Sequence, residues 1–327
     1  MKSHGNRDSI LASILSPCLL LLLMGCKNED FVCVDSPAPA AAAAEAASIE
    51  AASNSMAAAP GFATTEHVEG AEAGLVGDGV TDNTDAFRRL LGKGSRAIHV
   101  AAGDYVTGSL DIPGDTVLVL DSGVTIRDSG HLGPNDPLLN IRKDNVFVEA
   151  PGARVIANRS DYTTGEQRHG VFIFGASNVV IKGLESSGHG GDGFYIGGPS
   201  GKPSRNIVLK GCLASNNRRQ GLSITSAQRV FVVDCTFQDT SGTAPQFGID
   251  VEPNDPVDFV DQIRILRPRT IRNRGGGISL YLDALKATSP AVDIAVIYHH
   301  SQEERVEFQP HGPPSRLGHI QYRSDSQ

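Results

Sequence analysis

Two carboxylates stand two residues apart in a short segment, residues 248–254, whose pattern predicts a β-strand. They are Asp250 and Glu252, and they alternate with the apolar residues Ile249 and Val251. Because side chains alternate across a strand, we expect both carboxylates on its outer side. Such a pair suits acid/base catalysis at a glycosidic bond, since mutual repulsion raises the pKa of one member. The open alternative is that both only solvate the face of the strand.

Three polar residues, His169, Asp192 and Gln220, stand directly before the Gly that opens successive predicted strands. Stacked coils place such residues about 4.8 Å apart. Arg218 and Arg219 lie beside them in sequence, and a guanidinium is a natural bidentate partner for a sugar carboxylate. We therefore count Asp192 and His169 among the candidate catalytic residues, and both arginines and Gln220 among the candidate substrate-binding residues. An exposed ladder of polar side chains is the alternative.

Two tyrosines share the outward positions of the same strands. Tyr195 and Tyr281 alternate with apolar residues, so we expect their rings to stack on sugar rings. Trp is absent from the chain, which makes this platform a modest one.

One short segment, with apolar residues at alternate positions, recurs along the body of the chain; we call each copy a phrase. The six copies begin at Asn145, Asn178, Asn206, Arg229, Gln262 and Asp293. The last five of these starting positions are separated by 28, 23, 33 and 31 residues. Several phrases are followed by a second strand that opens with Gly. Units this short cannot close a core alone, but stacking them buries one continuous apolar column. We therefore expect a parallel β-helix, with a β-sandwich as the alternative.

The start of this region carries a family resemblance. Residues 77–87 (Gly-Asp-Gly-Val-Thr-Asp-Asn-Thr-Asp-Ala-Phe) and 99–105 resemble the opening of pectin-lyase-like right-handed β-helix proteins. The resemblance implies an all-β fold, a single-stranded right-handed parallel β-helix (a solenoid) with a short N-terminal capping helix. The residues agree locally, because Asn83 or Thr84 can cap a helix with an apolar face made by Ala86, Phe87, Leu90 and Leu91.

The same resemblance extends to function. Polygalacturonase-type hydrolases are similar in the opening and the coil, although only Gly188-His189-Gly190 matches their catalytic motifs. Alginate carbon-5 epimerases carry a Tyr-Gly-Phe-Asp-Pro-His-type strand, and residues 247–253 resemble it without its Tyr and His. The resemblance implies an enzyme that cleaves an acidic extracellular or envelope polysaccharide, a glycoside hydrolase or a polysaccharide lyase. A uronate lyase or epimerase with His169 or an Arg as base, and a non-catalytic glycan-binding rod or adhesin, stay open.

The N-terminal residues of the chain predict a targeting signal. Lys2 and Arg7 precede an apolar stretch of about 15 residues, which suits a signal-peptide core and is short for a membrane span of about 20. Residues 23–26, Leu-Met-Gly-Cys, resemble a bacterial lipobox, which implies lipidation of Cys26. We therefore expect anchoring in the bacterial cell envelope, at the outer membrane or the cell surface, or else secretion after an ordinary signal peptide.

These patterns divide the chain into four parts. Residues 1–25 are the signal peptide, and the Ala- and Pro-rich residues 26–62 predict a flexible tether. Residues 63–298 predict the β-helix domain. Residues 299–327 fit no coil clearly and are expected to form a cap or a disordered tail.

The composition of the chain limits which kinds of partner and metal ion we expect it to bind. The formal net charge of −8 provides no basic excess to neutralise phosphates, so we expect no nucleic-acid partner. The five Cys include no C-x-x-C pair, and the Asp-rich run near residue 80 lacks the spacing of a calcium loop, so no metal site is predicted. Calcium is left open as a cofactor. We expect a monomer whose partners are a polysaccharide and, through Cys26, a membrane.

Overall fold

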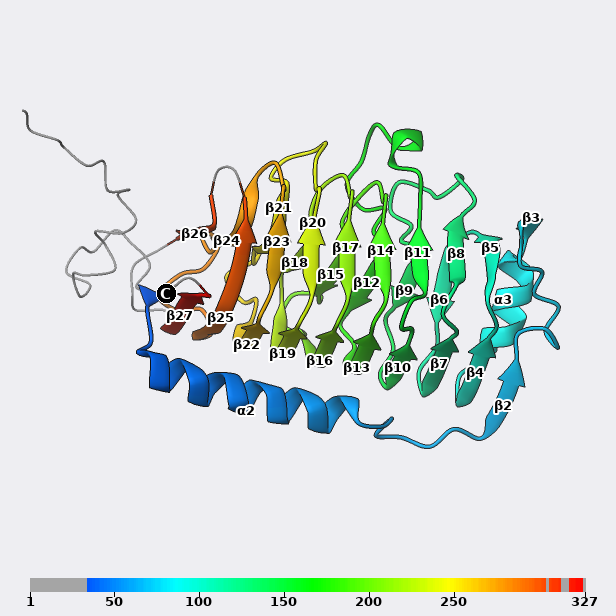
Figure 1. Cartoon of the computed structure of the whole chain (residues 1–327), viewed down its shortest axis with the longest axis horizontal. Coiled ribbons are helices and arrows are strands. Elements are labelled where there is room, and N and C mark those ends of the chain that lie inside the picture. Colours follow the sequence, from blue (N-terminus) through cyan, green and yellow to red (C-terminus); the bar gives the residue numbers. More distant parts are fainter. Residues whose placement is uncertain (1–33, 304–305, 313–317, 326–327) are drawn as a thin grey trace, which may run out of the picture.

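The computed structural model describes residues 34–303, 306–312 and 318–325. Parallel strands of successive coils stack along one axis and form three faces, with a long helix lying outside one of them (Figure 1). This is the parallel β-helix that the sequence predicts. Within these residues the helices are α2 (Pro39–Ala57), α3 (Thr84–Leu91) and the short 3-10 helix η1 (Arg159–Asp161).

The three faces are named sheets A, B and C. Sheet A contains β1 (Val34–Asp35), β2 (Glu66–Glu69), β4 (Arg96–Val100), β7 (Thr116–Leu120), β10 (Val146–Glu149), β13 (Ser177–Lys182), β16 (Ser204–Lys210), β19 (Ala227–Val233), β22 (Val260–Leu266), β25 (Val292–Gln302) and β27 (Gly318–Ser324). Sheet B contains β3 (Asp78–Asp82), β5 (Gly103–Thr107), β8 (Val124–Asp128), β11 (Arg154–Ile156), β14 (Glu185–Ser187), β17 (Leu213–Ser215), β20 (Thr236–Gln238) and β23 (Arg269–Ile271). Sheet C contains β6 (Leu110–Ile112), β9 (Leu139–Ile141), β12 (Val171–Phe174), β15 (Phe194–Gly197), β18 (Leu222–Ile224), β21 (Phe247–Val251), β24 (Gly276–Tyr281) and β26 (Phe308–His311).

The core is a set of apolar columns inside the coil. In sheet A one column joins the recurring phrases, and each of its side chains is fully buried: Val146, Val179, Ile207, Val230, Ile263 and Ile294. Burying one such side chain contributes about 1.5–3 kcal/mol. A single coil lacks both neighbours that bury it, so stability depends on stacking.

Asparagines turn the chain into sheet A. Asn145, Asn178 and Asn206 adopt left-handed backbone conformations, with φ of 64°, 60° and 56°. Asn tolerates this region better than most residues with a side chain. Their amides also bond along the stack, from Asn178 to Asn145 at 3.0 Å and from Asn206 to Asn178 at 2.9 Å. The repeated Asn is therefore a corner ladder that keeps the coils in register.

The predicted capping helix is α3, which closes the N-terminal end of the core. Phe87 and Leu90 point into it and are 2% and 1% exposed. The side chain of Asn83 does not cap this helix. It accepts a hydrogen bond from the backbone N–H of Val76 at 2.7 Å and donates one to the Val76 carbonyl at 3.0 Å. Asn83 thus fixes the chain that leads into the helix.

Residues 39–57, which the sequence predicts to lie in a flexible tether, form helix α2. The helix lies along the outside of sheet A, and the chain before it, β1, pairs with β27 at the opposite end from β2 (Figure 1). The N-terminal part of the described chain therefore runs back over most of the length of the coil. The predicted signal peptide and Cys26 lie outside the described residues.

The outer face of sheet A explains why α2 is held there. Phe147, Val180 and Phe231 point away from the coil, yet each is only 6% exposed because the helix covers them. The helix contributes its small side chains and Ile49, which is 2% exposed. Glu45 and Glu50 add ion pairs of 3.2 Å each to Arg264 and Arg267 of the sheet.

The C-terminal region continues the coil. Strand β25 extends to Gln302, and β26 and β27 add to sheets C and A, so the described part of residues 299–327 is mostly strand and continues the stack. Strand β1 then pairs with β27, with Val34 opposite Ile320. Covering an edge strand in this way removes a template for aggregation.

Candidate functional site

The strands of sheet C separate inward from outward side chains as the sequence predicts. Ile249 and Val251 are fully buried in the core, so Asp250 between them points outward. The pairing register places Asp250 opposite Ser223 on one side and Ser279 on the other. We call this outward line the Asp250 row; it comprises Asp111, Asn140, Phe172, Tyr195, Ser223, Asp250, Ser279 and Gln309.

A second outward line runs parallel to the first, at the C-terminal ends of the same strands. Phe174 pairs with Gly197, and Tyr281 pairs with His311. We call it the Glu252 row; in coil order it comprises Arg142, Phe174, Gly197, Thr225, Glu252, Tyr281 and His311. Both rows lie on the outer side of sheet C; Ser223 and Asp250 in the first are each 1% exposed, whereas Tyr281 in the second is 43% exposed.

The two predicted catalytic carboxyls lie in different surroundings. Asp250 is 1% exposed, and its Oδ2 accepts a hydrogen bond of 2.7 Å from the amide of Gln220. Its Oδ1 is buried without a hydrogen-bond partner. Burial, together with the charge of Glu252, raises the pKa of Asp250 to about 8. Asp250 therefore carries a proton at neutral pH.

Gln220 is oriented by the backbone. Its Oε1 accepts a hydrogen bond of 2.7 Å from the N–H of Phe247, which leaves its NH₂ group to face Asp250. The side chain is fully buried. Gln220 is thus a positioning residue under the predicted acid, and a sugar has no direct access to it.

Arg219 links the carboxylates of the site. Its Nη2 donates to Oε2 of Glu252 at 3.1 Å, and its Nη1 lies 3.4 Å from Oδ2 of Asp192. Its Nε lies 3.4 Å from Oε2 of Glu166, which sits on the loop that follows η1. The side chain of Glu252 is 27% exposed and that of Arg219 is 14% exposed. The positive charge is already surrounded by three acidic side chains.

His169 and Asp192 are both fully buried. The backbone N–H of Asp192 donates to Nδ1 of His169 at 3.0 Å, so the ring proton sits on Nε2, 3.1 Å from Oε1 of Gln167. Burial lowers the pKa of His169 to about 3, and Arg219 adds to this. The ring is therefore neutral, and its 3.3 Å approach to Oδ2 of Asp192 is not an ion pair. Burial raises the pKa of Asp192 to about 6, against the opposing charge of Arg219.

The remaining sequence-predicted residues are partly separated from this centre. Arg218 donates to the carbonyl oxygens of Gly165 and Thr163 and so holds a loop beside the site. Tyr195 donates to, or accepts from, the hydroxyl of Thr225 at 3.0 Å. Tyr281 is 43% exposed and follows Glu252 in its row. The structure gathers Asp192, Arg219, Gln220, Asp250 and Glu252, with His169 beneath them.

Sequence reasoning missed an aromatic group in the coils before the carboxyls. The rings of Phe172 and Tyr195 stack with centroids 4.9 Å apart, and Phe174 stacks on Phe172 at 5.2 Å. The guanidinium of Arg142 lies over both phenylalanine rings, at 4.9 and 5.1 Å. The signal was present, because Phe172 and Phe174 alternate with inward residues in β12. Alternation places both rings on the outer side of β12, where Phe172 is 8% exposed beneath Arg142.

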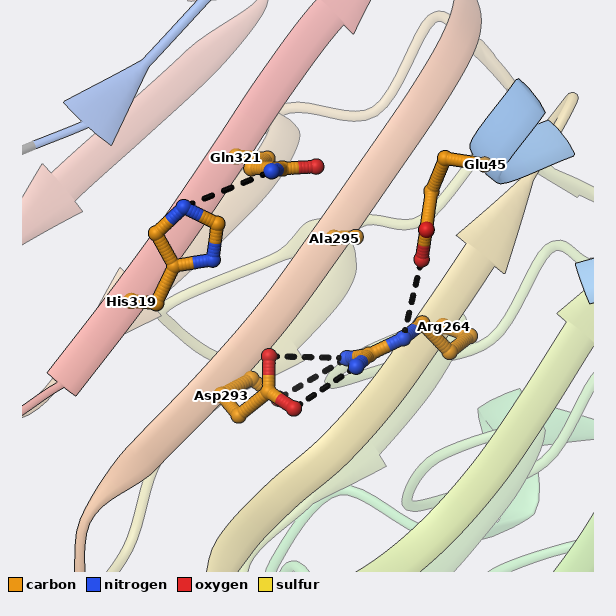
Figure 2. A pocket seen from close by; sticks show the side chains of 6 residues that line it. All are labelled: Glu45, Arg264, Asp293, Ala295, His319 and Gln321. Carbon is orange, nitrogen blue, oxygen red and sulfur yellow. Dashed lines mark hydrogen bonds and ion pairs between the residues drawn. The ribbon is translucent and has the colours of Figure 1, made fainter. Parts of the chain in front are cut away.

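A separate cavity of about 360 Å³ lies between α2 and the outer face of sheet A, away from sheet C (Figure 2). Its lining includes Arg264, which donates to both carboxylate oxygens of Asp293 at 3.0 and 2.6 Å and lies 3.2 Å from Glu45. The one guanidinium of the lining is thus already paired. This cavity belongs to the helix–sheet contact and holds none of the predicted site residues.

Residues 34–303, 306–312 and 318–325 contain no group of three or more His, Cys, Asp or Glu arranged to hold a metal ion. At the acidic centre, the guanidinium of Arg219 occupies the place between the carboxylates. In the same residues no helix has the length and apolar character to cross a bilayer.

Comparison with known proteins identifies the fold. A family model described as right handed beta helix region matches residues 142–289. The uncharacterized protein YclG of Bacillus subtilis (strain 168) is 27% identical over 242 residues, covering 62% of this chain and 40% of the relative. The chain thus spans less than half the length of this curated relative.

Solved structures agree on the architecture. The pre-mature bacteriophage phi29 gene product 12 superposes with a TM-score of 0.59 at 20% identity, over 74% of this chain and 33% of that protein. An iota-carrageenase, solved in complex with iota-carrageenan fragments, superposes with a TM-score of 0.51 at 11% identity, over 75% of this chain and 58% of that one.

Proposed function

The chain is a right-handed parallel β-helix protein, and we propose that it cleaves glycosidic bonds of an extracellular or envelope polysaccharide with the carboxyls of Asp250 and Glu252. The observation that carries the proposal is the difference between these neighbours. Asp250 is buried with a pKa raised to about 8, whereas Glu252 is partly exposed and paired with Arg219. Two carboxyls in such different surroundings suit the acid and base roles of a glycosidase, with Asp250 as the protonated member.

In this proposal Asp250 protonates the glycosidic oxygen of the leaving group. Glu252 either removes a proton from the attacking water or attacks the anomeric carbon itself as the nucleophile. Asp250 is only 1% exposed, so the Arg219–Glu252 pair must part when a sugar binds. Arg219 then stays near Asp192 and keeps the centre from accumulating unpaired negative charge. Gln220 holds the Asp250 carboxyl in place during this movement.

The fold likeness to an iota-carrageenase supports the polysaccharide class of substrate. The register agrees, because the Asp250 and Glu252 rows line up polar and aromatic residues along the coil axis. A polymer can follow such a line over several coils.

A lyase or epimerase that uses His169 as base has less support. The ring is fully buried, and its unprotonated nitrogen already accepts the N–H of Asp192. A base must reach the proton that it removes. Arg218 and Arg219 are engaged with carbonyls and carboxylates, respectively.

A product screen tests the proposal. The purified protein is incubated with polymeric uronates, sulfated galactans and neutral glycans, and products are read by mass and by ultraviolet absorbance. Saturated oligosaccharides are the expected products. Unsaturated uronates would show a lyase, and binding of a polymer without any product would show a glycan-binding rod.

We further propose that the protein is attached to the bacterial cell surface through lipid on Cys26. Support comes from the sequence of residues 23–26 alone. Cells fed labelled palmitate should incorporate label into the parent chain and not into a Cys26→Ser variant. Label retained in the variant would refute the anchor.

A further inference from the structure

The arginines beside the carboxyls are poorly suited to bind an acidic sugar. Arg218 donates to the carbonyl oxygens of Thr163 and Gly165. Arg219 already faces Glu166, Asp192 and Glu252. A further carboxylate or sulfate at this point would enter an environment with more negative than positive charge.

Arg142 is a cation on this face that has no acidic partner among the described residues. It is exposed, and its Nε donates to the side-chain oxygen of Asn140 at 3.1 Å. The amide of Asn140 in turn donates to Asp111 at 2.6 Å, so the nearest carboxylate of the Asp250 row is held by Asn140. The terminal nitrogens of Arg142 are therefore available to a ligand.

The rings beneath Arg142 fix its position. Its guanidinium lies 4.9 Å from the ring centre of Phe172 and 5.1 Å from that of Phe174. Stacking on aromatic faces stabilises a guanidinium and limits its freedom, while leaving its edge for hydrogen bonds. A flat cation over an aromatic floor is a suitable partner for the carboxylate of a sugar whose ring stacks nearby.

Arg142 and Glu252 share one row and are separated by four strand spacings, roughly 19 Å at about 4.8 Å per strand. At Gly197, between them, the Thr225 hydroxyl and the Tyr195 ring occupy the space where a Cβ would lie, so that coil presents these groups and no side chain of its own. One strand spacing is close to the length of one pyranose residue. An extended glycan can therefore lie along the row with one sugar on each coil.

We propose that Arg142, with Phe172 and Phe174, forms a remote subsite that binds an acidic sugar about four residues away from the bond cleaved at Asp250 and Glu252. The inference rests on the proposed function for the position of the cleaved bond. The binding of an acidic chain at Arg142 can be measured without any cleavage.

The first experiment measures binding by calorimetry in an Asp250→Asn background, which stops turnover. The probes are hexamers of galacturonate, mannuronate and guluronate, with maltohexaose as a neutral chain. Arg142→Gln should weaken binding of the preferred acidic hexamer about fivefold, and Arg142→Lys less. Arg154→Gln, an exposed arginine on sheet B, is the matched control and should leave binding unchanged.

The second experiment measures KM in the chain with its native Asp250, using acidic trimers and hexamers. Arg142→Gln should raise KM for the hexamer and leave the trimer unaffected, because a trimer at the cleavage point cannot reach Arg142. Equal effects on both lengths would overturn the remote position. Unchanged hexamer affinity in Arg142→Gln, equal loss for maltohexaose, or no binding of any acidic hexamer would overturn the subsite itself, whether or not the protein proves to be a hydrolase.

Discussion

Nη2 of Arg219 donates to Oε2 of Glu252 at 3.1 Å, and this contact distinguishes Glu252 from Asp250 two residues earlier on the same strand. Glu252 faces a cation at the edge of the site. Asp250 faces the amide of Gln220 below it and keeps its proton near neutral pH. The chemistry proposed above follows from that asymmetry.

Removing Arg219 should destabilise the fold more at pH 8 than at pH 5. Arg219→Ala leaves Asp192 buried and Glu252 unpaired, and uncompensated buried charge costs about 3–5 kcal/mol. At pH 5 the loss should be smaller, because Asp192, with a pKa already raised to about 6 by burial, takes up a proton. Urea unfolding at both pH values measures the difference. Arg218→Ala, which removes only bonds to carbonyls, is the control and should show equal losses at both.

Activity should fall as the pH rises through about 8. Burial raises the pKa of Asp250 to this value, and a general acid is lost when its proton leaves. A profile of kcat between pH 5 and 10 shows the descending limb. A rate that stays level from pH 7 to 10 would argue against Asp250 as the acid.

The same pKa shift predicts a change in stability. The folded-state pKa of Asp250 lies above its ordinary value, so the folded state holds more protons than the unfolded state between the two values. Stability should therefore decrease as the pH rises from about 4 to about 8. Asp250→Asn removes this contribution, so the variant should gain stability relative to the parent as pH increases. Parallel urea titrations at pH 5 and 9 test it, and an equal difference at both would contradict the burial of an ionisable Asp250.

The contact of α2 with sheet A should contribute to folding stability. Ile49→Ala removes a side chain that is 2% exposed, and such truncations typically cost about 2–5 kcal/mol. Ser48→Ala, at an exposed position one residue before, should change the free energy of unfolding by less than about 0.5 kcal/mol. Denaturant unfolding followed by circular dichroism compares the two. Equal stability of Ile49→Ala and the parent would mean that the helix is detached in solution.

Much of the fold could be predicted from local patterns. Alternation in β21 places Asp250 and Ile249 on opposite sides of the strand because the strand period is two; Ile249 lies in the apolar core, but Asp250, expected to face solvent, is only 1% exposed. The Asn at the start of successive phrases falls at one corner because the coils stack in register, and the amides bond along that corner. The packing of α2 on sheet A could not be predicted from the helix sequence itself, because that Ala-rich sequence resembles a tether. The strands of sheet A do carry a signal, because Phe147, Val180 and Phe231 are apolar at outward positions. Such positions indicate that another segment of the protein covers this face.

The site was less predictable than the coil. Sequence spacing finds the corner residues His169, Asp192 and Gln220, and the structure does stack them at one corner. It does not reveal that His169 is neutral, because this follows from burial and from the charge of Arg219. It also does not reveal that Arg218 turns toward a loop, because this depends on contacts with residues 163 and 165. Long loops of this kind set the electrostatics of the centre, and their conformation follows no period.

The most direct measurement is the initial rate of cleavage by Asp250→Asn and Glu252→Gln on whichever glycan the product screen identifies. Each substitution should lower the rate by about 100-fold or more, since each removes one half of an acid/base pair. Glu185→Gln, which makes the same change on sheet B, should retain the parental rate. If Asp250→Asn and Glu252→Gln both cleave as fast as Glu185→Gln, the two carboxyls are not the catalytic pair.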